Sequence, residues 1–273
     1  MNHTGFARFE PCRRQRPSET QAFAAAACPD AFIRTIIGFS TVLPIPRRMT
    51  FHPDWFSSAA CITALIALAV LLCAAAKPAL AVFRRPAAPA AAALWMALLW
   101  SLTITPDHGQ LAGFSHHLLG VNLTALMVGI PAAFWLASLL LVPYLLLHGA
   151  TPAVLAPNIL ALLLPALLMN FLFRKAVSKL PANLFIFIFL NGFICSAAGV
   201  VLTGFVTVGL LDGAGAFPSE ALWQRAFPAF FLLGWGEAFL SGLFTATFVA
   251  LKPHLLHTFD DAFYLKRRNS IWK

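Results

Sequence analysis

The sequence predicts an all-α integral membrane protein, a polytopic membrane helix bundle of about seven transmembrane helices. Two observations lead to this prediction. First, 60% of the 273 residues are hydrophobic and only 11% are charged, whereas a soluble domain carries about 25% charged residues. Second, the charges are gathered in short stretches between long apolar runs. Because backbone polar groups inside lipid must bond to one another, apolar runs of about 20 residues predict helices that cross the bilayer.

Three parts of the chain differ in composition. Residues 1–48 mix Arg, Pro and Ser with only a short apolar stretch. They are predicted to be a poorly structured extension, and a start at Met49 would leave them untranslated. Residues 49–265 form the predicted integral membrane domain. Residues 266–273 form a basic cytoplasmic tail.

The apolar runs give the spans in order. The first two are predicted at Trp55–Ala76 and Ala87–Thr105. The next run, His117–Leu147, is interrupted by Gly129 and Pro131, and a proline inside a helix breaks or kinks it. Three further spans are predicted at Thr151–Phe173, Asn183–Leu211 and Ala226–Leu251.

Positive charge in the loops decides the topology. Loops 77–86 and 174–181 carry three Lys or Arg each and the C-terminal tail carries five, whereas loops 106–115 and 148–154 carry none. The positive-inside rule places the basic loops in the cytoplasm. Both neutral loops can lie outside only if the run 117–147 forms two short helices. This gives seven spans, with the N-terminal end of the first span outside and the C-terminus cytoplasmic.

Missing motifs exclude several function classes. The sequence contains no H-E-x-x-H, no G-x-S-x-G and no P-loop, so we predict no enzyme activity and no use of ATP by this chain alone. The net charge is +9, and from residue 49 onward nearly all Lys and Arg lie in loops 77–86 and 174–181 and in the C-terminal tail, a distribution typical of topology rather than of nucleic-acid binding. The five cysteines form no C-x-x-C pair, and no cofactor is predicted.

Histidines near the outer side are the best candidate ligands. His116 and His117 open the third apolar run, directly after a loop that carries Asp107 and His108. Imidazole suits Ni, Co, Cu and Zn. Since adjacent residues on a helix point about 100° apart, one of the pair is expected to face a site, and we favour His117.

Buried polar residues form a second group of candidates. Glu237 is the only carboxylate within a predicted span, and ionisable groups inside membranes usually face a bundle interior or a pathway. Asn158 and Asn191 are candidates of the same kind. Each of the three residues could bind substrate or line its pathway, or could form a hydrogen bond that pairs helices.

Five segments in a fixed order carry a family resemblance: Ser115–Gly120, Asn158–Leu160, Leu180–Phe185, Glu237–Gly242 and Thr258–Asp261. Together, over about residues 52–265, they resemble the CbiM-type membrane components of cobalt/nickel energy-coupling-factor transporters, especially a divergent bacterial branch.

The resemblance implies a seven-helix substrate-binding component in a bacterial inner membrane, working with a transmembrane coupling subunit and two cytoplasmic ATPases. The implied substrate is a Co or Ni ion. In that family the metal is held by the free amino terminus, a histidine next to it, and a histidine before Leu-Leu-Gly. The last maps onto His117, while this chain has no Met-His at its start. Asp260 and Asp261 are the implied contacts for the partner subunits.

His52 offers a substitute for the missing ligands. A start at Met49 followed by methionine removal would expose Thr50-Phe51-His52, whose amine, two amides and imidazole suit square-planar Ni(II) or Cu(II). The alternative is a surface histidine in a capping sequence, His52-Pro53-Asp54.

The sequence therefore predicts outer-side capture of a transition-metal ion near His117, with His52 and His116 as further ligands. Three alternatives stay open: a membrane scaffold without a solute, a permease for a non-metal solute, and an intramembrane enzyme with Glu237 as its acid.

Overall fold

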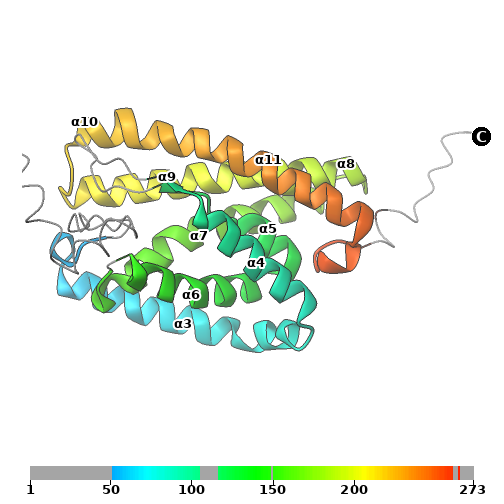
Figure 1. Ribbon diagram of the computed structural model, residues 1–273, viewed down its shortest axis with the longest axis horizontal. Coiled ribbons are helices and arrows are strands. Elements are labelled where there is room, and N and C mark those ends of the chain that lie inside the picture. The colour runs from blue at the N-terminus through cyan, green and yellow to red at the C-terminus, as the bar shows by residue number, and fades with distance from the viewer. Residues whose placement is uncertain (1–50, 105–115, 149, 261–263, 265–273) are drawn as a thin grey trace, which may run out of the picture. The chain divides into compact units, whose positions relative to one another are not determined.

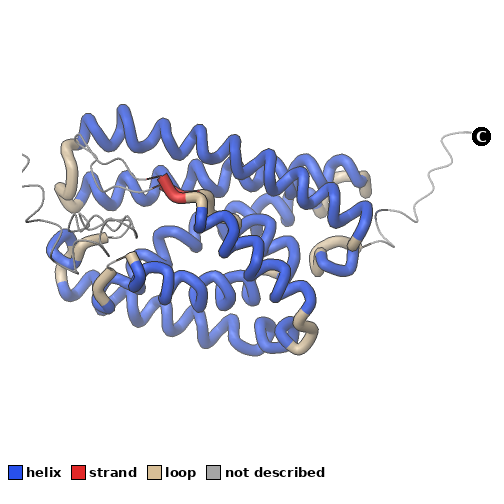
Figure 2. The backbone as a smooth tube through the Cα atoms, in the orientation of Figure 1, coloured by secondary structure: helices blue, strands red, loops and turns tan. Residues whose placement is uncertain are grey.

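The long helices of the protein form one bundle. The computed structural model describes residues 51–104, 116–148, 150–260 and 264. Within these residues five helices are long and apolar enough to cross a membrane, and Figures 1 and 2 show them running alongside one another. Their bounds are Ser58–Phe83 (α3), Ile130–Leu147 (α6), Pro152–Val177 (η3 and α7), Leu184–Gly213 (α8 to α9) and Ser219–Leu251 (α10 to α11). The predicted all-α membrane bundle is confirmed.

Two of these helices contain π-helical turns. The first consists of α8 (Leu184–Ile186), the π-helix η4 (Phe187–Ile194) and α9 (Cys195–Gly213). The second consists of α10 (Ser219–Ala221), the π-helix η5 (Leu222–Ala226) and α11 (Phe227–Leu251). Because a π-turn shifts the hydrogen bonding of the backbone, it can leave carbonyl groups available to other partners, and such turns are frequent at functional sites.

A sixth apolar helix, α4 (Ala87–Ser101), leads into a short hairpin. The hairpin pairs β1 (Thr103–Ile104) with β2 (His116–His117) in antiparallel register, Thr103 opposite His117. The chain then enters α5 (Val121–Val128), which has only eight residues. In Figure 2 the strand is drawn in red among blue helices and tan loops.

Gly129 separates α5 from α6 with a backbone φ of +81°. The predicted break of the run His117–Leu147 is therefore confirmed. The prediction of a helix at its start is wrong, since residues 116–120 are not helical. Hydropathy alone does not separate a buried extended segment from a helix.

The first two spans also differ from their predicted bounds. Helix α3 continues past Ala76 through Lys77 and Pro78 to Phe83. Proline is tolerated in membrane helices, and the long lysine side chain can extend toward the membrane surface. Helix α4 ends at Ser101 instead of Thr105. Three short 3-10 turns complete the fold: η2 (Pro53–Trp55), η3 (Pro152–Val154) and η6 (Pro253–Leu255).

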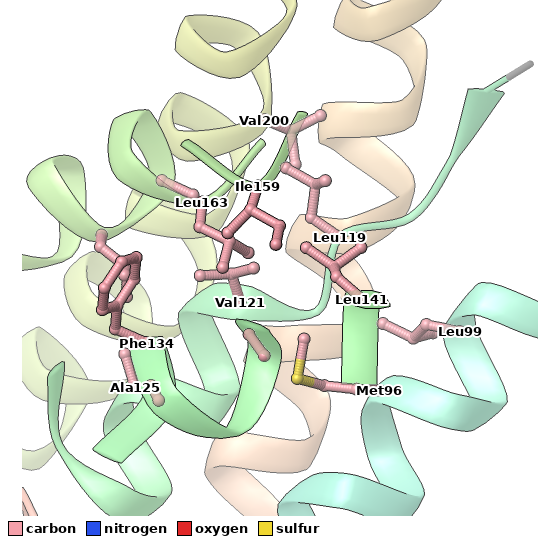
Figure 3. Close-up of a cluster of buried hydrophobic side chains, with 14 of the residues drawn as sticks. Met96, Leu99, Leu119, Val121, Ala125, Phe134, Leu141, Ile159, Leu163 and Val200 are labelled. Atoms are coloured by element: carbon pink, nitrogen blue, oxygen red, sulfur yellow. The ribbon is translucent and has the colours of Figure 1, made fainter. Parts of the chain in front are cut away.

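The core of the bundle surrounds α5, all eight residues of which are buried. This helix packs against α4, α6 and α7. Figure 3 shows the apolar side chains of this region, which come from five helices and the segment before α5: Met96, Leu99, Leu119, Val121, Ala125, Phe134, Leu141, Ile159, Leu163 and Val200. The count of seven spans and their orientation stay predictions, and the predicted extension 1–48 and tail 266–273 lie outside the described residues.

Candidate functional site

The segment from His116 to Val128 is an extended stretch followed by a short helix. Five residues at about 3.3 Å and eight at 1.5 Å give a length of about 28 Å. The hydrocarbon core of a bilayer is about 30 Å thick. Non-helical backbone at membrane depth is tolerated only where protein covers it, and His116, His117, Leu119 and Gly120 are all buried. The segment thus has the length and the burial of a broken span.

His117 lies at the start of this segment, enclosed by aromatic rings. Its side chain is 8% exposed and contacts Trp100 of α4 and Tyr144 of α6, with ring centroids 6.2 Å and 5.7 Å away. Its Nδ1 lies 2.9 Å from the carbonyl oxygen of Leu118. Since a carbonyl can only accept, Nδ1 carries the proton and Nε2 keeps its lone pair. Metal-binding histidines commonly have this arrangement.

His116 faces the opposite side of the strand. Successive side chains on a strand alternate between its two faces, and the ring of His116 lies against Phe230 of α11 at 5.2 Å. The two histidines thus face different surroundings because they alternate on a strand, and the predicted helical geometry of the pair is wrong. That one of them faces a site stays a prediction.

Gly120 turns the chain from the extended segment into α5. Its φ of +67° lies in the left-handed region, and an added Cβ would come within 2.9 Å of the Leu99 side chain. Two indoles of α4 hold the turn: Trp95 Nε1 donates to the Gly120 carbonyl (3.1 Å) and Trp100 Nε1 donates to the Leu119 carbonyl (3.0 Å). The turn is therefore fixed against α4.

Glu237 of α11 binds the same turn from the other side. Its Oε2 accepts a hydrogen bond from the Leu119 amide (2.5 Å), and the Gly120 amide faces the same carboxyl group. Ser196 of α9 donates to Oε1 at 3.4 Å. Glu237 is 1% exposed. The structure thus places the only carboxylate predicted within a span against the turn at Leu119 and Gly120. Leu119, whose amide it binds, is two residues from His117 in the sequence.

A polar network holds α5 below the turn. Asn122 Nδ2 donates to the carbonyls of Asn191 (2.8 Å) and Gly192 (3.3 Å) in the π-helix η4, and to Ser241 Oγ (3.4 Å). Asn170 Nδ2 donates to Asn122 Oδ1 (2.7 Å). Asn191 was a predicted pathway residue. Here its backbone accepts, and its buried Oδ1 makes no hydrogen bond within the described residues.

Asn158 bonds to Phe51, the residue before His52, near the start of the described chain. Asn158 Oδ1 accepts from the Phe51 amide (3.0 Å), and its Nδ2 donates to the Val154 carbonyl (2.7 Å). His52 is the N-cap of η2, with Nδ1 2.9 Å from the Asp54 carboxylate. None of the hydrogen bonds, ion pairs or ring contacts of His52 involves His117.

The structure therefore does not join His52, His116 and His117 into one cluster by any of these contacts. Among the described residues, no group of three or more His, Cys, Asp or Glu side chains is placed to hold a metal ion. Asp107 and His108, singled out in the preceding loop, lie outside the described residues. A metal bound at His117 would need ligands besides these three side chains as they stand.

Two residues around His117 were not selected as site residues from the sequence. His148, at the end of α6, packs its ring against Tyr144 at 4.3 Å with the two planes tilted by 42°, and its Nδ1 lies 2.7 Å from the Tyr144 carbonyl. Tyr144 thus contacts both His117 and His148. The sequence signal for these residues was a tyrosine and a histidine four positions apart, at the predicted outer end of the span that finishes at Leu147.

The chain after α11 returns to the far end of α5. The backbone amides of His257 and Thr258 donate to the carbonyls of Met127 and Leu126 (3.0 and 3.2 Å), and Thr258 Oγ1 also donates to Leu126 (2.9 Å). Asp260, a predicted partner contact, is exposed just beyond. Asp261 lies outside the described residues.

Comparison with known proteins bears on the family and the fold. A family model, CbiM, described as a cobalt uptake substrate-specific transmembrane region, matches residues 51–255. A solved structure described as a truncated transition-metal transporter has a TM-score of 0.57 and 18% identity, and the match covers 74% of this chain and 98% of that one. None of the curated proteins matches the sequence. At this identity the solved structure supports the fold alone.

Proposed function

Since this chain belongs to the CbiM family, we propose that it is the substrate-capture permease component of a transition-metal importer, with a Co or Ni ion as its substrate. One observation from the structure carries the proposal. His117 is buried at the broken span, its Nδ1–H is occupied by the Leu118 carbonyl, and Nε2 is left as a potential ligand. Imidazole nitrogen is a preferred ligand of both ions.

The proposed site includes the imidazole of His148 as a second ligand and His52 as a further one. His148 borders the same Tyr144 ring as His117 and offers Nε2 in the same way. His52 stays a proposed ligand, together with the amine and amide nitrogens of the sequence Thr50-Phe51-His52. In this proposal Glu237 holds the Leu119 backbone, Asn158 holds the Phe51 backbone, and the Asn191 carbonyl anchors Asn122 of α5.

The proposed topology has seven crossing segments. These are the five long helices, α4, and the broken segment from His116 to Val128. The positive-inside rule places the basic loops 77–86 and 174–181 in the cytoplasm. The hairpin with His117 then lies toward the outer side, and the segment after α11 lies inside.

Energy for transport is proposed to come from partners. The sequence carries no P-loop, so a transmembrane coupling subunit and two cytoplasmic ATPases would supply it, in the bacterial inner membrane. Asp260 and Asp261, on the inner side beyond α11, are the proposed contacts for these partners.

A non-metal solute is the second candidate. The absence of a three-ligand group among the described residues favours it, and the rings of Trp100 and Tyr144 around His117 would suit a small organic molecule.

Metal content and calorimetric titration with Ni(II), Co(II), Cu(II) and Zn(II) test the proposal, using the full chain in detergent. His117→Ala is the informative variant. His254→Ala, an exposed histidine of η6, is the matched control. Stoichiometric binding that only His117→Ala removes would establish metal capture. A folded protein that binds none of the four ions would overturn it and leave the organic solute.

A further inference from the structure

We propose that Glu237 is a positioning residue for His117: its carboxyl group fixes the backbone of residues 119 and 120 and so sets where the His117 side chain lies. The inference rests on the proposed function, since His117 is there the metal ligand. Glu237 itself does not touch the metal. Its own contacts in the described chain are the amides of the turn and the Ser196 hydroxyl.

The local geometry requires such a residue. Gly120 occupies the N-cap position of α5 and has no side chain with which to cap the helix. The Leu119 and Gly120 amides face the protein interior, where an amide without a partner is costly. The Glu237 carboxyl group accepts from the Leu119 amide, faces the Gly120 amide and adds negative charge at the N-terminal end of α5, where the helix dipole favours it.

Within the described residues, the other side-chain hydrogen bonds to the turn go to its carbonyl groups. Trp95 and Trp100 donate to the carbonyls of Gly120 and Leu119, and Thr124 Oγ1 also donates to Gly120 (2.9 Å). These bonds fix one side of the peptide planes to α4 and α5. Glu237 fixes the opposite side to α11, so the segment is held between two helices. Without it, rotation of these peptides would move His117, two residues away.

Helix α11 thereby connects the site to the rest of the bundle. Ser241, one turn beyond Glu237, accepts from Asn122 of α5, and Phe230, two turns before it, contacts His116. A shift of α11 along the bundle would therefore reach the His117 segment through the Glu237 carboxyl group as well as through Phe230.

Glu237→Gln tests the inference because it keeps the shape of the side chain but leaves one oxygen to accept where the carboxyl group offers two. Two controls are available. Ser196→Ala removes only the hydroxyl donor to Oε1, and Thr247→Val alters an exposed threonine of the same helix that bonds its own backbone at 2.8 Å. Hydrogen exchange of residues 116–121 in metal-free protein and calorimetric metal affinity are measured for each variant.

We expect Glu237→Gln to speed exchange of the Leu119 and Gly120 amides and to weaken metal binding by about 10-fold or more, the usual effect of losing a group that orients a ligand. Thr247→Val should stay within about 3-fold of the parent affinity on the same scale, and Ser196→Ala, which keeps the Leu119 bond, should weaken binding less than Glu237→Gln does. In the His117→Ala background, Glu237→Gln should leave any residual metal binding unchanged, which a general loss of stability would not.

The outcomes separate this inference from the proposed function. Parent protein that binds no metal overturns metal capture, while faster exchange in Glu237→Gln still supports the positioning of the segment. Metal binding and exchange that are both unchanged in Glu237→Gln overturn the positioning role and leave metal capture intact. If the Gln variant does not fold, Glu237→Asp replaces it, because this variant keeps the charge but holds it one methylene further from the Leu119 amide. Its amides must then exchange faster than those of the parent. Exchange as slow as in the parent overturns the inference.

Discussion

Helices α3 and α5 are both apolar, yet they occupy opposite environments. Of the 26 residues of α3 only Leu68 and Ala79 are buried, whereas all eight residues of α5 are buried. The most apolar of the five long helices thus lies at the periphery, and the short helix with Asn122 and Thr124 lies at the centre. Polar groups inside a membrane need partners within the protein. Polar residues in an apolar run therefore identify the interior better than hydropathy does.

The sharpest test of this contrast is Gly120→Ala at the entrance to α5. The left-handed backbone costs an alanine about 1–2 kcal/mol, and the contacts of its Cβ with Leu99 and Trp95, at 2.9 and 3.0 Å, add an overpacking cost of about 1–3 kcal/mol. We expect the free energy of unfolding to fall by about 2–5 kcal/mol in denaturant titrations. Gly209→Ala in α9, whose Cβ would meet nothing within 4 Å, should be neutral or stabilising. Equal effects would mean that the turn is not fixed.

Leucine truncation compares the two helices directly. Leu123→Ala in α5 should cost about 2–4 kcal/mol because it leaves a cavity in a fully buried site. Leu65→Ala in α3, where the side chain is 59% exposed, should cost less than about 0.5 kcal/mol, since lipid chains can fill the space. Thermal unfolding in the same detergent measures both. A large loss for Leu65→Ala would show that α3 is covered by protein.

The polar network gives a third comparison. Asn122→Ala removes hydrogen bonds to η4, α7 and α11 and leaves Asn170 Nδ2 without its acceptor. The expected loss is about 1–3 kcal/mol. Thr63→Ala in α3 removes one exposed bond to the Ala60 carbonyl and should change stability by less than about 0.5 kcal/mol. Similar losses for the two variants would contradict an anchoring role for Asn122.

The sequence predicted the long helices because a run of about 20 apolar residues has few alternatives in a membrane. It also predicted the break at Gly129, where glycine and proline stand together. Residues 116–120 were mispredicted, since their extended form depends on cover from α4 and α11 and on the indoles of Trp95 and Trp100. That cover is tertiary and leaves no local periodicity.

The candidate site was predictable only in part. His117 and Glu237 were singled out because polar groups in apolar runs are rare. Their relation was not predictable, since Glu237 bonds a backbone amide 118 positions away, and an amide carries no sequence signal. The π-helix η4, whose carbonyls accept from Asn122, could not be predicted from the sequence for the same reason. Side-chain chemistry can be read from sequence, but backbone partners require the fold.

The smallest expected effect lies at the other end of α5, where the chain after α11 is attached. Thr258→Val keeps the side-chain shape and the backbone bond of residue 258 but removes the hydroxyl bond to the Leu126 carbonyl. We expect a loss of about 1 kcal/mol, the net value of one hydrogen bond. Thr247→Val, whose hydroxyl bonds its own helix on an exposed face, should lose less. If both variants lose the same, the side chain of Thr258 contributes nothing specific, and the backbone bonds of residues 257 and 258 alone hold this end of α5.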